Sequence, residues 1–155
     1  MKSKMLKFKA FALSLVLVLT LFSCSDDGDD AKTFLEENGG TVWKLTLGGE
    51  SIYAQINNSE SSPIEFWVPS EYEDNCYENE TVIGIGGVEI LENTENVFKV
   101  KVEDGENDYI IMTFTITGSV LTIKYEYFED GELDDTQTLP LQKTDDDPDD
   151  LPLCE

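Results

Sequence analysis

Apolar and polar residues alternate with a period of two along most of the chain after residue 40, which is typical of half-buried β-strands. The clearest unit is 109–128, where two long alternating runs flank Gly118-Ser119. A glycine at the first position of a two-residue loop favours a type II′ hairpin. Asp130-Gly131 signals a second hairpin turn. Similar runs predict further strands at 41–47, 51–56, 63–68, 80–87, 97–102 and 136–142.

Pro140 interrupts the last of these runs. Because proline has no N–H to donate to a ladder, we expect this strand to lie at an edge of the sheet or to end there.

A short helix is predicted over 31–40, before the first strand. Asp29 or Asp30 is a suitable N-cap, and Phe34 and Leu35 give the segment an apolar side. Gly39-Gly40 is a typical helix end.

These elements predict an all-β fold: a single antiparallel up-and-down barrel of about eight strands, or a closely related sandwich, preceded by one short helix. The alternation points one set of bulky side chains at the interior. We therefore expect a possible ligand to meet the following residues: Trp43, Leu45, Ile110, Met112, Phe114, Ile123 and Tyr125. Whether this interior is hollow or filled is left open by the sequence.

The N-terminal 23 residues have the parts of a bacterial export signal, with four lysines followed by 13 uncharged, mostly apolar residues at 10–22. That run is shorter than the roughly 20 apolar residues that span a bilayer, although a membrane anchor and an ordinary signal peptide remain alternatives. Leu21-Phe22-Ser23-Cys24 resembles the lipobox of bacterial lipoproteins. This resemblance implies that residues 1–23 are removed, and that Cys24 carries a lipid and begins the mature protein.

Residues 24–30 form an acidic tether, and "SDDGDD" resembles the export signal that follows the lipidated cysteine in surface lipoproteins of Bacteroidetes. The residues that carry this likeness are Ser25, Asp26, Asp27, Asp29 and Asp30. The resemblance implies a protein anchored in the outer membrane and displayed on the cell surface. A plain flexible linker, with the protein on the periplasmic face, is the alternative.

Once Cys24 is assigned to lipid, Cys76 and Cys154 remain in an exported, oxidising setting. We predict that they form a disulfide that pins the C-terminal tail to the domain, with two separate thiols as the alternative.

The charge and the missing residue types narrow the function. Between Cys24 and Glu155 there are six lysines and 33 acidic residues, hence a formal charge of −27, which disfavours nucleic acid. Histidine and arginine are absent, so Ser-His-Asp catalysis and histidine-ligated metals are excluded. Strand carboxylates such as Glu65, Glu89 and Glu126 fall on outward positions, and we expect no enzyme, no metal centre and no cofactor. The acidic runs 103–108 and 145–150 could hold Ca²⁺ weakly.

The stretch "FLEENGGTVWKLT" at 34–46, followed by a meander of strands, resembles the lipocalin-like lipoproteins of Bacteroidetes. The resemblance covers most of 31–143 and implies a barrel domain at 31–155, with a Pro- and Asp-rich tail, that encloses a small apolar molecule and has no catalytic residues. The alternative is a filled barrel whose loops bind a surface protein or a glycan. For that alternative the candidate contacts are Tyr53, Trp67, Tyr72 and Tyr77, unless these aromatics only cover the domain.

Overall fold

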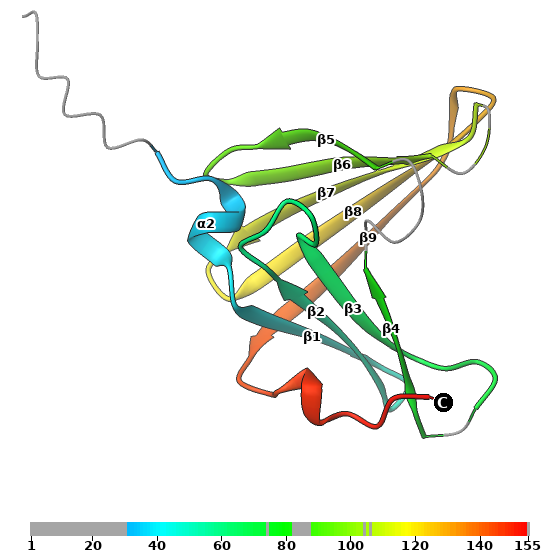
Figure 1. The fold of residues 1–155 in the computed structure, drawn as a ribbon. Helices are drawn as coiled ribbons and strands as arrows, with labels where there is room; N and C mark the ends of the chain where they lie inside the picture. The colour runs from blue at the N-terminus through cyan, green and yellow to red at the C-terminus, as the bar shows by residue number, and fades with distance from the viewer. Residues whose placement is uncertain (1–30, 74, 82–87, 104, 106, 155) are drawn as a thin grey trace, which may run out of the picture. The chain divides into compact units, whose positions relative to one another are not determined.

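The computed structural model describes residues 31–154 except 74, 82–87, 104 and 106. Lys32–Glu155 is one compact unit. Its described residues form one antiparallel sheet of nine strands and a single short α-helix (Figure 1), so the predicted all-β class is confirmed. The expectations for the export signal and for Cys24, Ser25, Asp26, Asp27, Asp29 and Asp30 lie outside the described residues. None of the described helices has the length and hydrophobicity of a membrane-spanning segment.

The elements follow one another with short connections. Their bounds are α2 Phe34–Asn38, β1 Thr41–Leu47, β2 Glu50–Ile56, β3 Ile64–Pro69, β4 Tyr77–Thr81, β5 Val88–Asn93, β6 Val97–Glu103, β7 Tyr109–Thr117, β8 Val120–Glu129, β9 Glu132–Thr144 and the 3₁₀ helix η1 Pro148–Asp150. The predicted strand 41–47 coincides with β1, and the other predicted strands overlap observed ones.

The strand order is β4-β3-β2-β1-β9-β8-β7-β6-β5, so consecutive strands pair with one another and the first strand also pairs with the last. Among the described strands, β4 and β5 are the only consecutive pair that is not hydrogen-bonded to each other, and they form the two edges of an open sheet. Because every described ladder is antiparallel and nine is an odd number, β4 and β5 run in the same direction. An antiparallel ladder between them is therefore excluded.

The count of about eight strands was too low, because the predicted strand 80–87 overlaps the end of β4 and is followed by β5. Residues 82–87 lie outside the described part of the chain. Strand β5 was missed because its alternation is broken: the β5–β6 register shifts between Ile90 and Glu92. The extra residue, Leu91, is 43% exposed instead of facing the core.

Glycine-containing turns set the register of the hairpins. Gly118 has φ 60° and links Thr117 and Val120, which are paired, so the predicted hairpin at this position is confirmed. At the β8–β9 turn, Asp130 and Gly131 have φ 51° and 79°, and positive φ at both positions is the type I′ pattern.

The expectation for Pro140 was wrong, since β9 continues to Thr144 and lies between β1 and β8. The reason lies in the direction of the backbone groups. The Lys143 N–H donates to the Ser119 carbonyl on the β8 side, and N–H groups alternate along a strand, so position 140 faces the β1 side. The β1–β9 ladder covers only residues 142–144 of β9. Position 140 lies outside this ladder, so the missing N–H of Pro140 costs no hydrogen bond to β1.

The predicted helix is confirmed, but its cap was misassigned. The N-cap is Thr33, whose hydroxyl accepts a hydrogen bond from the Glu36 N–H at 3.3 Å. The Glu36 carboxylate in turn accepts from the Thr33 N–H at 2.8 Å, which completes a capping box. These hydrogen bonds lower the pKa of Glu36. Neither Asp29 nor Asp30 is needed for this helix start.

Helix α2 packs into one end of the hydrophobic core. Phe34 and Leu35 are buried, and the Phe34 ring lies 6.2 Å from that of Phe98, which lies 5.8 Å from Phe114. Trp43 of β1 is buried in the same cluster, which continues through β2, β3 and β6–β9. We call the sheet face that carries this core the inner face, and the opposite one the outer face.

Candidate functional site

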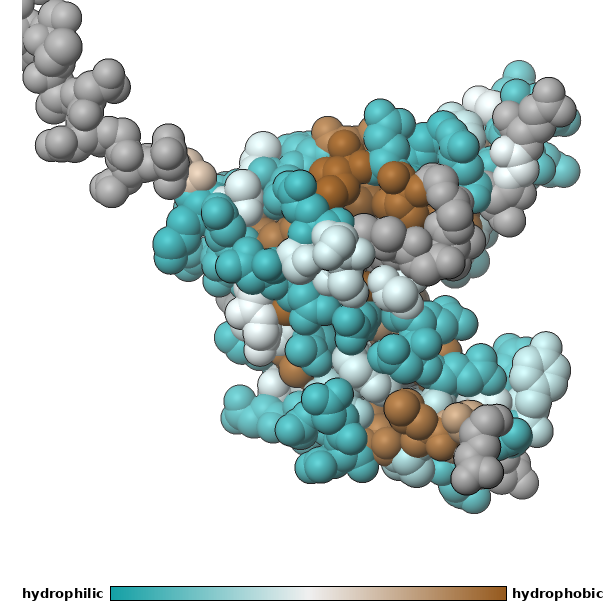
Figure 2. Space-filling model, in the orientation of Figure 1, coloured by the Kyte–Doolittle hydropathy of each residue, from teal (hydrophilic) through white to brown (hydrophobic). Residues whose placement is uncertain are grey.

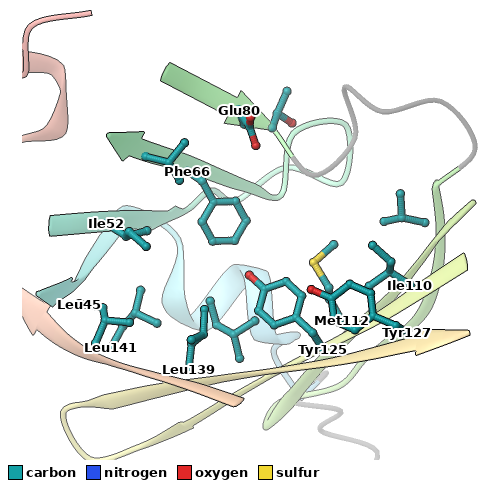
Figure 3. A pocket seen from close by; sticks show the side chains of 14 residues that line it. Leu45, Ile52, Phe66, Glu80, Ile110, Met112, Tyr125, Tyr127, Leu139 and Leu141 are labelled. Atoms are coloured by element: carbon teal, nitrogen blue, oxygen red, sulfur yellow. The ribbon is translucent and has the colours of Figure 1, made fainter. Parts of the chain in front are cut away.

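A cavity of about 240 Å³ lies on the inner face, beyond the part of the core that α2 fills (Figure 3). Strands from both halves of the sheet line it, from β1–β4 and from β6–β9. Its wall is almost wholly aliphatic and aromatic. Among the described residues that line it, polar side-chain groups come only from Glu80, Thr81, Tyr125 and Tyr127.

Five of the seven residues predicted to face the interior line this cavity: Leu45, Ile110, Met112, Ile123 and Tyr125. The other two, Trp43 and Phe114, point to the same face but are fully packed in the core beside α2. The sequence pattern identifies the face of a strand, but it does not show where along the strand a helix fills the space.

Several lining residues were not predicted, although most of them follow the same alternation: Ile52, Phe66, Val68, Val102, Tyr127, Leu139 and Leu141. Their signal was present in the period-two pattern of their strands. Glu80 had no such signal, because it is a charged residue at an inward position. The Phe66–Glu80 register pair fixes its direction, since Phe66 packs against the core.

Two tyrosine hydroxyls form the polar part of the cavity wall. Tyr125 and Tyr127 lie two residues apart on β8, their rings are stacked at 6.4 Å, and their hydroxyl groups point into the cavity (Figure 3). Burial is the main cause that raises the pKa of Tyr125 to about 12, and the electrostatic effect of the neighbouring Tyr127 is the second cause. Tyr125 is therefore a neutral phenol at physiological pH, able both to donate and to accept a hydrogen bond. Within the described part of the chain, neither hydroxyl has a hydrogen-bond partner.

A second aromatic group, the outer aromatic cluster, consists of Tyr53, Trp67 and Tyr77. The register places it on the outer face. Trp43 faces inward, so the next residue of β1, Lys44, faces outward. Lys44 pairs with Tyr53 of β2, and Tyr53 pairs with Trp67 of β3, so these side chains share the outer face. Tyr53 is 6% exposed and Trp67 is 3% exposed. Only Tyr72, which is 89% exposed, fulfils the expectation of an aromatic side chain open to solvent.

The C-terminal tail crosses this outer face. Near β1, Asp146 bonds to Lys44 at 2.9 Å, and at β4 the Tyr77 N–H donates to the Pro152 carbonyl at 2.8 Å. Since β2 and β3 lie between β1 and β4, the tail passes over the strands that carry Tyr53 and Trp67 (Figure 1). The predicted disulfide between Cys76 and Cys154 is present and fixes the end of this tail beside β4.

Metal-binding groups are few in the described part of the chain. The one cluster of three candidate ligands joins Glu73 with Cys76 and Cys154, and both sulfurs of that cluster are used in the disulfide. In the run 145–150, Asp146 pairs with Lys44 and Asp147 caps η1. Weak calcium binding at 103–108 or 145–150 stays a prediction.

The surface around these sites is mostly hydrophilic. On the face drawn in Figure 2, apolar side chains appear over β5 and near the β1–β2 turn. Leu91 of β5 and Leu47 of β1 are exposed.

Comparison of the chain with models of known protein families, with curated proteins and with solved structures gives no significant match.

Proposed function

We propose that the chain is a non-catalytic, lipid-anchored binding protein whose lipocalin-like domain holds a small apolar molecule on its inner face. The apolar cavity is the observation that carries this proposal. Its volume of about 240 Å³ exceeds the roughly 150 Å³ that suffice for a benzene-sized guest. Few polar groups and an otherwise apolar wall are typical of small-molecule sites. A ligand with one or two rings, or with a short aliphatic chain, fits this volume.

The proposal includes a barrel, and the strand directions support it. Strands β4 and β5 follow one another in the chain and run in the same direction. Together they can act as one interrupted strand, whose first part pairs with β3 and whose second part pairs with β6. The sheet then has eight strand positions, which is an even number and therefore compatible with an antiparallel barrel.

Native mass spectrometry after incubation with small-molecule and lipid extracts tests the binding proposal. We expect a specific adduct with the full chain, and with residues 32–155 as a parallel sample. Leu139→Trp fills the cavity and is expected to remove the adduct. Leu133→Trp, on the same strand but 55% exposed, is the matched control that keeps it. Protein that stays bare in every extract would contradict the proposal.

The anchor is supported by the resemblance of residues 21–24 to a lipobox. In a bacterial host with lipoprotein export, we expect Cys24→Ser to move the protein from the membrane fraction to the soluble fraction. Replacing Asp26, Asp27, Asp29 and Asp30 by asparagine should keep it in the membrane fraction but protect it from protease added to intact cells. Unchanged protease sensitivity would favour the plain-linker alternative.

Binding of a protein or glycan through the loops is the second candidate function. Tyr72 favours it, because this aromatic side chain is 89% exposed in the connection between β3 and β4. Capture of a partner that is lost with Tyr72→Ala but kept with Leu139→Trp would establish this second function.

A further inference from the structure

Among the described residues, the cavity wall carries an acidic side chain and no basic one. Glu80 of β4 faces the inner side of the sheet, and its carboxylate lies above Phe66 on the cavity side (Figure 3). In the described part of the chain, the Glu80 carboxylate has no ion pair and no hydrogen bond. None of the 14 described lining residues is a lysine. An anionic ligand head would therefore face a carboxylate without any compensating cation.

The remaining groups suit a cationic head. The hydroxyls of Tyr125 and Tyr127 also point into the cavity, where they can accept hydrogen bonds from an ammonium group. The aromatic rings of these tyrosines and of Phe66 also line the cavity, and the face of an aromatic ring attracts a cation. The formal net charge of −23 raises the local concentration of cations around the whole molecule.

We propose that the cavity binds a small apolar amine, with the aliphatic or aromatic body against the apolar wall and the protonated amino group between Glu80 and the two tyrosine hydroxyls. This inference rests on the proposed function of the same cavity and specifies the chemistry of its ligand. Alcohols of the same size should bind more weakly, and carboxylates should bind most weakly.

Three probes with the same chain length separate the contributions: octylamine, octanol and octanoate. Met112 lines the cavity, and the other methionines are Met1 and Met5, so a ¹³C-labelled methionine methyl signal reports on occupancy. A Met112→Leu variant of the full chain assigns that signal. At pH 7 we expect all three probes to shift it, with octylamine binding at least threefold more tightly than octanol.

Glu80→Gln should weaken the binding of octylamine about threefold to fivefold, which is the effect expected for loss of an exposed ion pair. The affinity for octanol should not change. Glu80→Lys should make octanoate bind more tightly than octylamine. Glu132→Gln removes one exposed acidic charge from the start of β9 and is the matched control, with both affinities unchanged. Added salt should reduce the preference for the amine but not the affinity for octanol.

The outcomes separate the inference from the function on which it rests. If octanol shifts the Met112 signal, but octylamine shows no preference or Glu80→Gln leaves the preference intact, the amine proposal is wrong and the apolar site stands. If none of the probes shifts Met112, both proposals fall.

Discussion

Tyr53 and Trp67 are directly paired across the β2–β3 ladder on the outer face of the sheet, and both are nearly inaccessible to solvent. Outward positions of a sheet are normally open to water. Here the tail crosses these strands between Lys44 and Tyr77, and it ends at the Cys76–Cys154 disulfide. We therefore expect the tail from Asp146 to Cys154 to cover these two aromatic residues.

The first prediction concerns the disulfide. Replacing Cys76 and Cys154 by serine removes a link between residues 78 positions apart, and should lower the free energy of unfolding by about 2–4 kcal/mol. Urea unfolding followed by circular dichroism measures this change. In a Trp43→Phe background only Trp67 emits, and we expect its fluorescence to shift to longer wavelength in the double variant. An unshifted spectrum would show that something other than the tail covers Trp67.

The second prediction concerns the other end of the tail. The pKa of Lys44 is raised mainly by its hydrogen bond to Asp146 and, second, by one to Tyr53. The same hydrogen bond to Lys44 lowers the pKa of Asp146. Asp146→Asn should therefore speed amide exchange at Tyr77 and Cys154, whose N–H groups hold the tail. Asp145→Asn removes the same charge one residue earlier and should leave these exchange rates unchanged.

The same pair predicts a pH dependence. The pKa of Asp146 is lowered in the folded state, so the stabilising contribution of this pair is present above the ordinary carboxyl value of 3.8. It is lost as the pH falls through the lowered value. Amide exchange at Tyr77, corrected for its intrinsic pH dependence, should speed up in that acidic range in the wild-type chain. In Asp146→Asn it should not.

Tyr125 gives a prediction at alkaline pH. Burial raises its pKa from 10.0 to about 12, so the folded state keeps a proton that the unfolded state releases. The free energy of unfolding should therefore fall as the pH rises from 10 to 12. In the Tyr125→Phe variant this free energy should fall less steeply over the same range. Urea unfolding at several pH values measures both slopes, with Tyr72→Phe at an exposed position as the control. Equal slopes for wild type and Tyr125→Phe would contradict the buried position of this phenol.

The helix cap permits a direct comparison of two assignments. Thr33→Ala removes the capping box and should lower the free energy of unfolding by about 1 kcal/mol. Asp29→Ala and Asp30→Ala, the caps that the sequence suggests, should each change it by less than about 0.5 kcal/mol. Thermal and urea unfolding of the three variants measures these changes. If the helix began earlier, an aspartate variant would be less stable than Thr33→Ala.

The sequence was sufficient for the features that depend on local pattern. The bounds of β1, the β7–β8 turn at Gly118 and the inward direction of Ile110, Met112 and Ile123 all follow from alternation and glycine chemistry. The disulfide followed from counting cysteines, without any knowledge of the fold.

Features that depend on distant parts of the chain could not be found in this way. Trp43 and Phe114 have the same pattern as the cavity residues, but α2 packs against their end of the sheet. Pro140 is tolerated inside the sheet only because the ladder between β1 and β9 is short. Trp67 is buried although it faces outward, and the tail on its side of the sheet comes more than 70 residues later in the sequence, which no alternation records.

The β1–β9 ladder also constrains the order in which the chain folds. It has only three register pairs, and Val42–Thr144 joins residues about 100 positions apart. A chain that emerges from the ribosome N-terminus first has β1 ready long before its partner exists. Closing such a large loop early is entropically costly, and contacts between distant residues slow folding. The first strand must wait for the last one, so the two halves of the sheet are joined only when almost the whole chain has been released.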